Sequence, residues 1–200
     1  PFVRPHQSHP AATRRRAQKR QPALRLHAQR LLVERGNKDV VSALCELVRD
    51  QRMDEIGLNA AAIHALWTLE GLGALEGSDQ QAVAAATTAL RQPSTGVRRA
   101  GLMVLPRNES SLDAILRINL LDDPEAQVRL AAFLALSEMP ASDAAGAAVF
   151  AALQDPQNSE DRWIPEAATA AAARHDAGFL KAVLAGYKPA ALEAANSSPA

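Results

Sequence analysis

One pattern of apolar and polar positions recurs five times along the chain. Each copy opens with an apolar residue and a mostly polar one, and small or apolar residues follow at offsets of 3, 4, 7 and 8, apart from a His at offset 3 of the first copy. These offsets share one face of an α-helix. The copies begin at Leu24, Leu58, Val97, Val128 and Ile164. The pattern predicts five helices, which we call the template helices.

A second amphipathic segment follows each template helix at a similar distance. These segments are 38–50, 79–91, 110–121, 143–154 and 177–187. Gly, Pro, Asn and Ser residues separate them from their neighbours, and no stretch alternates like a strand. The sequence therefore predicts an all-α protein: ten helices paired into about five hairpins and stacked as a right-handed α-solenoid.

The periodic pattern covers only the middle of the chain and divides it into three parts of different composition. Residues 1–22 contain four prolines and lack apolar periodicity, residues 23–188 carry the repeats, and residues 189–200 form a low-complexity tail. We expect 1–22 to be an extended or loosely helical basic arm, acting as a solvated linker or lying on the acidic remainder of the chain. A contact with nucleic acid or an acidic partner, and a targeting role, are the alternatives.

Charge is divided between the two ends of the sequence. The chain has 22 Lys+Arg and 22 Asp+Glu, but residues 1–35 hold nine of the basic residues and a single acidic one, Glu34. The equal numbers of basic and acidic residues argue against a uniformly basic nucleic-acid or membrane-surface module.

Only one Cys is present, and no apolar run is long enough to predict a membrane span. Because the chain starts at Pro1 and both end repeats look uncapped, we expect it to be part of something larger.

Two stretches resemble the HEAT-repeat family. Residues 122–132 (DDPEAQVRLAA) are similar to its signature, an Asp/Pro turn followed by Val-Arg-x-Ala, and residues 93–100 are a weaker copy without the Asp. The repeat spacing of 31 to 39 residues is shorter than the usual HEAT period. The resemblance implies a helical-repeat scaffold for protein–protein contacts.

A closer resemblance covers roughly residues 24–185. Residues 28–36 and 64–72, the latter with Leu-Trp-Thr-Leu-Glu-Gly, are similar to the HEAT segment of bacterial multidomain proteins typical of planctomycetes. Those proteins join a dehydrogenase-like β-propeller, HEAT repeats and a c-type haem domain. The resemblance implies an exported, periplasmic docking domain within a redox complex, with a c-type cytochrome or dehydrogenase as partner. This chain has no CxxCH, so no haem or dehydrogenase role passes to its residues.

Candidate chemistry is sparse. His6 and His9 form the one close His pair, too few ligands for a zinc site, and HExxH, P-loop, GxGxxG and GxSxG motifs are absent. We therefore predict no catalytic residue, no metal site and no cofactor. His27, His64 and His175 are expected to pack or cap helices, and Cys45 to be a buried thiol. Nucleic-acid binding through the basic arm remains the alternative function.

Arginines recur at offset 1 of the repeats. Arg98 and Arg129 occupy this position in consecutive copies, and Arg25 matches them. They could form a basic stripe for phosphate, or a ladder that joins repeats through loop carboxylates such as Asp122 and Asp123. We favour the ladder, because the sequence beyond residue 35 is net acidic.

The side of the template helices opposite the repeat face is also apolar. Offsets 5, 6 and 9 lie on that side. The predicted partner-binding residues there are Ile63, Trp67, Leu102, Met103, Phe133 and Leu134. Neighbouring helices could bury them, or they could form an apolar patch that another protein or domain covers. In the second case Trp67 is the best anchor. Trp163, at a helix start, is expected to pack locally.

Overall fold

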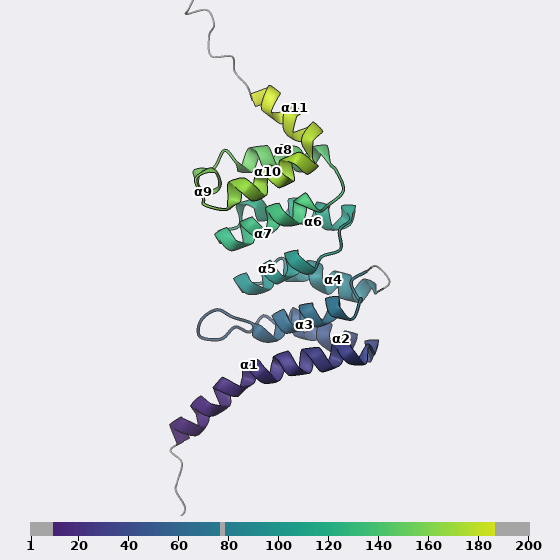
Figure 1. Ribbon diagram of the computed structural model, residues 1–200, viewed down its shortest axis with the longest axis vertical. Coiled ribbons are helices and arrows are strands. Elements are labelled where there is room, and N and C mark those ends of the chain that lie inside the picture. The colour runs from purple at the N-terminus through teal and green to yellow at the C-terminus, as the bar shows by residue number, and fades with distance from the viewer. Residues whose placement is uncertain (1–9, 77–78, 187–200) are drawn as a thin grey trace, which may run out of the picture. The chain divides into compact units, whose positions relative to one another are not determined.

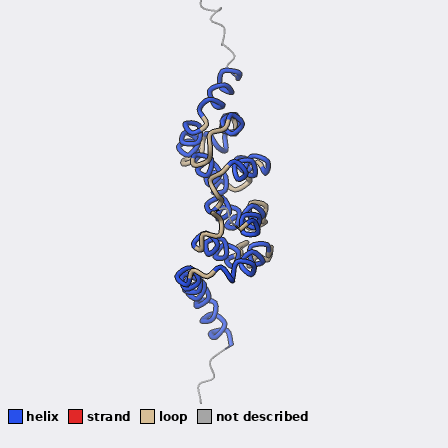
Figure 2. Tube along the Cα trace, turned by 90° about the vertical axis from the view of Figure 1, so that its right-hand side faces the viewer, coloured by secondary structure: helices blue, strands red, loops and turns tan. Residues whose placement is uncertain are grey.

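The computed structural model describes the backbone of residues 10–76 and 79–186, with side chains from residue 23 on. In this part of the chain all regular secondary structure is helical, with eleven α-helices, two short 3₁₀ turns and no strand (Figures 1 and 2). The all-α prediction is confirmed. The tail predicted at 189–200 and the first nine residues of the arm lie outside the described residues. The helices fall into two compact units, Pro1–Pro106 and Arg107–Ala200, which are described in turn.

The first unit consists of two layers of helices. Its elements are α1 (Pro10–Arg35), the 3₁₀ turn η1 (Lys38–Val40), α2 (Val41–Arg49), α3 (Ala60–Gly71), α4 (Gln80–Ala89) and α5 (Thr95–Val104). Helix α3 packs on both α1 and α5, and these three lie one above the other in Figure 1. Helices α2 and α4 pack on each other to form the second layer, while α2 also packs on α3 and α4 on α5.

The second unit uses the same scheme. Its elements are α6 (Glu109–Ile118), η2 (Leu120–Asp122), α7 (Ala126–Ser137), α8 (Asp143–Ala152), α9 (Pro156–Ser159), α10 (Ile164–Arg174) and α11 (Asp176–Gly186). Helix α7 packs on α10 in one layer, and α8 packs on α6 and α11 in the other. In both units, helices two places apart in the repeat therefore lie side by side.

All ten predicted helices are present, and all except the first lie within a few residues of their expected bounds. Helix α9 was not predicted. It is a single turn in which the side chain of Asp155 accepts from the N–H of Gln157 and Pro156 occupies the first helical position. The sequence pattern also placed the first helix too late, because the α1 backbone is already helical from Pro10. Residues 10–22 of the predicted arm thus continue the first template helix.

Small residues build the core. Ala62, Ala65, Ala82, Ala85 and Ala86 are almost completely buried in the first unit. In the second unit, α8 and α11 approach each other very closely. A Cβ atom at Gly146 would lie 2.3 Å from the backbone N of Phe179, and one at Gly178 would lie 2.2 Å from the carbonyl O of Asp143. The two helix backbones therefore touch, and only glycine fits at this crossing.

Side chains of Asn59, Asp79, Asn108 and Ser142 accept hydrogen bonds from backbone N–H groups at the start of α3, α4, α6 and α8. Such caps satisfy donors that the first turn of a helix leaves free, so they fix where each helix begins. Among the described helices, none combines the length and apolar character needed to cross a membrane.

Candidate docking surface around Trp67

The six predicted partner-binding residues do not form one exposed patch. Leu102 and Phe133 are completely buried, so their assignment to a binding surface is wrong. Met103 and Leu134 are 44% and 49% exposed, and Ile63 and Trp67 are half-buried. A helix within a layer contacts helices of its own layer as well as helices of the other layer. More than one of its faces is therefore buried, including offset 5, where Leu102 and Phe133 lie.

Trp67 lines a hollow of about 410 Å³ between α1 and α3 of the first unit. Its apolar lining comes from Leu26, Val33, Trp67 and Gly71. Its polar lining consists of Gln29, Arg30, Glu34 and Glu70. An indole with aliphatic neighbours is typical of the centre of a protein interface, and a polar border is typical of its rim. We call this hollow the Trp67 site.

Close packing of α1 on α3 shapes the Trp67 site. A Cβ atom at Gly71 would lie 2.8 Å from Cγ2 of Val33, so the glycine lets α1 approach the end of α3. The Nζ of Lys38 donates to the carbonyl O of Gly73 over 3.2 Å, which ties the segment after α1 to the turn after α3. On the α1 side, Nε of Arg30 lies 3.2 Å from Oε1 of Glu34. Two residues of the charged border are thus paired along α1.

A polar contact joins the same two helices. The Nδ1 atom of His64 lies 2.7 Å from Oε1 of Gln29, which matches an imidazole N–H donating to the amide oxygen. Thr68 Oγ1 donates to the carbonyl O of His64 over 2.7 Å. Burial, with the nearby positive charge of Arg25, lowers the pKa of His64. The neutral imidazole therefore helps to hold α1 against the helix that carries Trp67.

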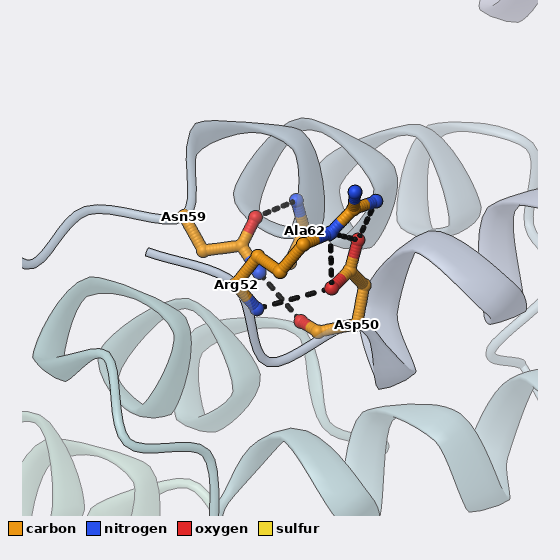
Figure 3. A network of polar contacts seen from close by, with 4 residues as sticks. All are labelled: Asp50, Arg52, Asn59 and Ala62. Carbon is orange, nitrogen blue, oxygen red and sulfur yellow. Dashed lines mark hydrogen bonds and ion pairs between the residues drawn. The ribbon is translucent and has the colours of Figure 1, made fainter. Parts of the chain in front are cut away.

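A second structured feature follows α2 in the first unit. The loop 50–59 is held at its base by three residues, and Figure 3 shows them together. The guanidinium of Arg52 donates to both carboxylate oxygens of Asp50, with Nε to Oδ2 at 2.8 Å, and this contact lowers the pKa of Asp50. Asn59 donates to the carbonyl O of Asp50 over 2.6 Å and accepts from the N–H of Ala62. The loop therefore closes directly onto the start of α3.

Two of the three offset-1 arginines, Arg98 and Arg129, make the same contact, one in each unit. Nη1 of Arg98 donates to the carbonyl oxygens of Gln92 and Pro93, six and five residues earlier. Nη1 of Arg129 donates to those of Asp123 and Pro124, at the same two separations. Arg129 is only 6% exposed. Its guanidinium is therefore directed into the protein, as the ladder interpretation expects, and is not presented to a phosphate.

Arg129 also reaches the next repeat. Its Nε donates to Oδ1 of the buried Asn158 over 2.7 Å, and its Nη2 donates to the carbonyl O of Gln157. Asn158 in turn donates to the carbonyl oxygens of Leu121 and Ala152. The first unit has a similar link, in which Nε2 of Gln92 donates to the carbonyl O of Val48 over 2.7 Å. These amides are bridging partners that the sequence pattern did not predict.

The remaining singled-out residues have mixed outcomes. Cys45 is completely buried, and burial raises the pKa of its thiol, as expected for a structural Cys. His175 is buried at the C-terminal end of α10 and is hydrogen-bonded there, whereas His27 is exposed, so the expectation of packing was wrong for His27. Trp163 is 51% exposed and lies under the guanidinium of Arg162, 4.7 Å from the ring centroid. Its predicted role in packing is therefore only partly met.

No group of three or more His, Cys, Asp or Glu side chains that could hold a metal ion occurs among the described residues. His6 and His9 lie outside those residues.

Sequence reasoning missed the α1 half of the Trp67 site. Leu26, Arg30 and Val33 stand at offsets 2, 6 and 9 of the first repeat, and Trp67 stands at offset 9 of the second. The same helical side that drew attention to Trp67 could therefore have identified them. The loop 50–59 had no such signal, because its order depends on contacts between residues of different types.

Comparison of the chain with protein-family models, with curated proteins and with solved structures finds no match.

Proposed function

We propose that this chain is a non-catalytic helical-repeat scaffold of the HEAT type, continuing as a right-handed α-solenoid. Three features support the proposal: the two-layer packing within each unit, the Arg–carbonyl contact that recurs in α5 and α7, and the Asp/Pro–Val-Arg pattern of the sequence. Repeat proteins of this kind are stabilised by contacts between neighbouring repeats and use their extended surfaces for binding.

The Trp67 site is the observation that carries the function. Binding energy at protein interfaces concentrates in a few buried aromatic and Arg side chains, surrounded by a polar rim that excludes water. Trp67 is half-buried at an open hollow with Arg30, Glu34 and Glu70 on its border. In this proposal a partner protein, or a neighbouring domain, inserts apolar side chains against Trp67 and covers it.

The resemblance to the HEAT segment of bacterial multidomain proteins suggests which partner to look for. The proposal places this chain in an exported, periplasmic assembly and makes a c-type cytochrome or a dehydrogenase the docked partner. In such an assembly the chain positions its partner and supplies no redox group itself. This part of the proposal rests on the sequence stretches 28–36 and 64–72.

The test is isolation from the native source under mild conditions, followed by identification of the bound proteins and a visible absorption spectrum of the same sample. The proposal predicts a stoichiometric partner protein, and its redox version predicts a haem spectrum from that partner. A chain that is isolated alone and colourless, and that binds duplex DNA with strong salt dependence, would contradict docking in favour of a nucleic-acid role for the basic arm.

A further inference from the structure

The 50–59 loop presents apolar side chains to solvent on an ordered backbone. Ile56 at its tip is 78% exposed, and Met53 and Leu58 are 46% and 40% exposed. A ten-residue connection without secondary structure of its own is long for a helical protein, and such loops often carry function. Single exposed apolar residues are ordinary, but three in one short loop need an explanation.

Hydrogen bonds inside the loop fix the tip. The carboxylate of Asp54 accepts from the N–H groups of Ile56 and Leu58, over 3.1 and 2.9 Å. The N–H of Asp54 donates to the carbonyl O of Leu58 over 2.8 Å, and Gly57 takes the positive φ of 78° that this turn needs. The Oγ of Ser94 also donates to the carbonyl O of Gly57. The tip is therefore preorganised, which lowers the entropy cost of binding.

The same unit has an apolar groove that suits such a tip. The groove has a volume of about 170 Å³ and lies between α1, α2 and α3. Its apolar lining consists of Ala28, Leu32, Leu44, Leu47, Ala61 and Ala65. Leu47 is 42% exposed, and so the groove is open on the α2 side. We call it the α1–α2 groove.

Charge supports a fit between loop and groove. The loop carries the acidic residues Asp50, Asp54 and Glu55 against one basic residue, Arg52. The α1 wall of the groove includes Arg25, and the described side chains of α1, from residue 23 on, include three arginines and one acidic residue, Glu34. An acidic loop with an aliphatic tip and an aliphatic groove with a basic wall are complementary in both respects.

We propose that two copies of this chain associate by reciprocal insertion, with Ile56 of each copy entering the α1–α2 groove of the other. A twofold contact needs a surface that is complementary to itself, and a knob and a matching hole on one unit meet this requirement. The association does not use Trp67, and of the residues that line the two hollows only Gln29 is shared, so the two contacts are tested by different variants. The proposal therefore stands or falls independently of the docking function.

The test is sedimentation velocity of the full chain over a range of concentrations, with Ile56→Asp and Leu47→Asp variants. The wild-type chain should dimerise, and each variant should weaken dimerisation by about 100-fold or more, because a carboxylate would be buried in an aliphatic contact. Leu184→Asp, at a 75% exposed leucine on α11 in the other unit, is the matched control and should leave dimerisation unchanged. Circular dichroism checks that each variant is folded.

Mixing the two variants tests the geometry. Ile56→Asp retains an intact groove and Leu47→Asp an intact loop, so a mixture can form one of the two contacts and should associate more strongly than either variant alone. A monomeric wild-type chain at high concentration would overturn the proposal. So would a dimer that tolerates Ile56→Asp, or a mixture that associates no better than its components.

Discussion

Arg129 shows how a single side chain joins repeats. Its guanidinium donates to carbonyl oxygens of Asp123, Pro124 and Gln157 and to the amide of Asn158, in an almost fully buried position. A buried charge is tolerated only where such partners satisfy it, because burial without them is costly. The contact therefore links the turn before α7 to the turn that contains α9.

Replacing Arg129 by Ala should lower the free energy of unfolding by about 2–4 kcal/mol, because it leaves buried carbonyl oxygens and the Asn158 amide without a donor. Urea unfolding followed by circular dichroism measures the change. Arg162→Ala, at an exposed arginine of the same unit, is the matched control and should change stability by less than about 0.5 kcal/mol. Equal effects of the two substitutions would contradict the role given to Arg129.

His175 is a buried imidazole whose two nitrogens are both used. Nδ1 accepts from the N–H of Ser142 over 3.1 Å, so Nε2 carries the proton and donates to the carbonyl O of Leu136 over 2.9 Å. Burial is the main cause that lowers the pKa of His175, and the Arg174 charge acts in the same direction. A proton on Nδ1 would oppose the Ser142 N–H, so the folded state favours the neutral ring.

Stability should therefore fall as the pH drops below about 6.5, the pKa of an unperturbed His, because the unfolded chain takes up the proton first. The loss continues until the pH reaches the lowered pKa of the folded state. His175→Asn should flatten this dependence in urea midpoints measured between about pH 7 and pH 5. His27→Gln, at an exposed His, should leave it unchanged. An unaltered slope in the His175 variant would contradict this assignment.

At the scale of elements, the crossing of α8 and α11 is set by two glycines. Gly178 faces the backbone of Asp143, and Gly146 faces the backbone of His175 and Phe179, at separations that exclude a methyl group. The aromatic rings of Phe150 and Phe179 pack edge to face beside this crossing, with centroids 6.0 Å apart. Helix α11 is therefore attached to its unit by backbone proximity as well as by side chains.

Gly178→Ala should destabilise the second unit by about 2–3 kcal/mol, even though Ala is the better helix former, because the backbone at Asp143 cannot move aside cheaply. Gly96→Ala in α5 is the matched control. There the new methyl meets mainly the Cδ1 end of the Ile63 side chain, which can rotate away, so stability should change by less than about 1 kcal/mol. A neutral Gly178→Ala, measured by urea unfolding, would show that the helices are further apart.

Asp54 orders the tip of the 50–59 loop, where its carboxylate accepts from two backbone N–H groups. Asp54→Ala should leave the urea midpoint of the chain nearly unchanged, since the carboxylate is exposed and caps only loop N–H groups. Amide hydrogen exchange at Ile56 and Leu58 should become markedly faster. Glu55→Ala, next along the loop and also exposed, is the control and should leave exchange at these amides unchanged. Unchanged exchange in Asp54→Ala would show that the loop is held by other contacts.

At the scale of the whole molecule, periodicity predicted more than residue chemistry did. The offsets 3, 4, 7 and 8 located the template helices because burial against neighbouring helices imposes them over many residues. The same helical periodicity wrongly placed Leu102 and Phe133 on a binding surface. The position of a residue on its own helix does not show that neighbouring helices also bury its side of the helix. The sequence did not predict the hydrogen bonds that Asn158 and Gln92 make between repeats. A side-chain amide that donates to a carbonyl oxygen far away in the sequence produces no local sequence pattern.

The first helix gives the clearest example of what sequence could not settle. Prolines and charges in residues 1–22 argued for an arm, yet the helical backbone begins at Pro10, where a proline is tolerated in the first turn. That helix supplies half of the Trp67 site. The sequence therefore predicted only the α3 side of the candidate site, through Trp67. The packing of α1 on α3 supplies the other side.

The most direct test of docking at the Trp67 site is the affinity of the natively isolated partner for Trp67→Ala and Trp163→Ala variants, measured by titration calorimetry. Both remove one indole, but only Trp67 lines the hollow. If a partner covers Trp67, Trp67→Ala should lower the affinity by at least about 30-fold, equivalent to about 2 kcal/mol, and Trp163→Ala should change it little. Equal affinities of both variants and the wild-type chain would contradict docking at this site.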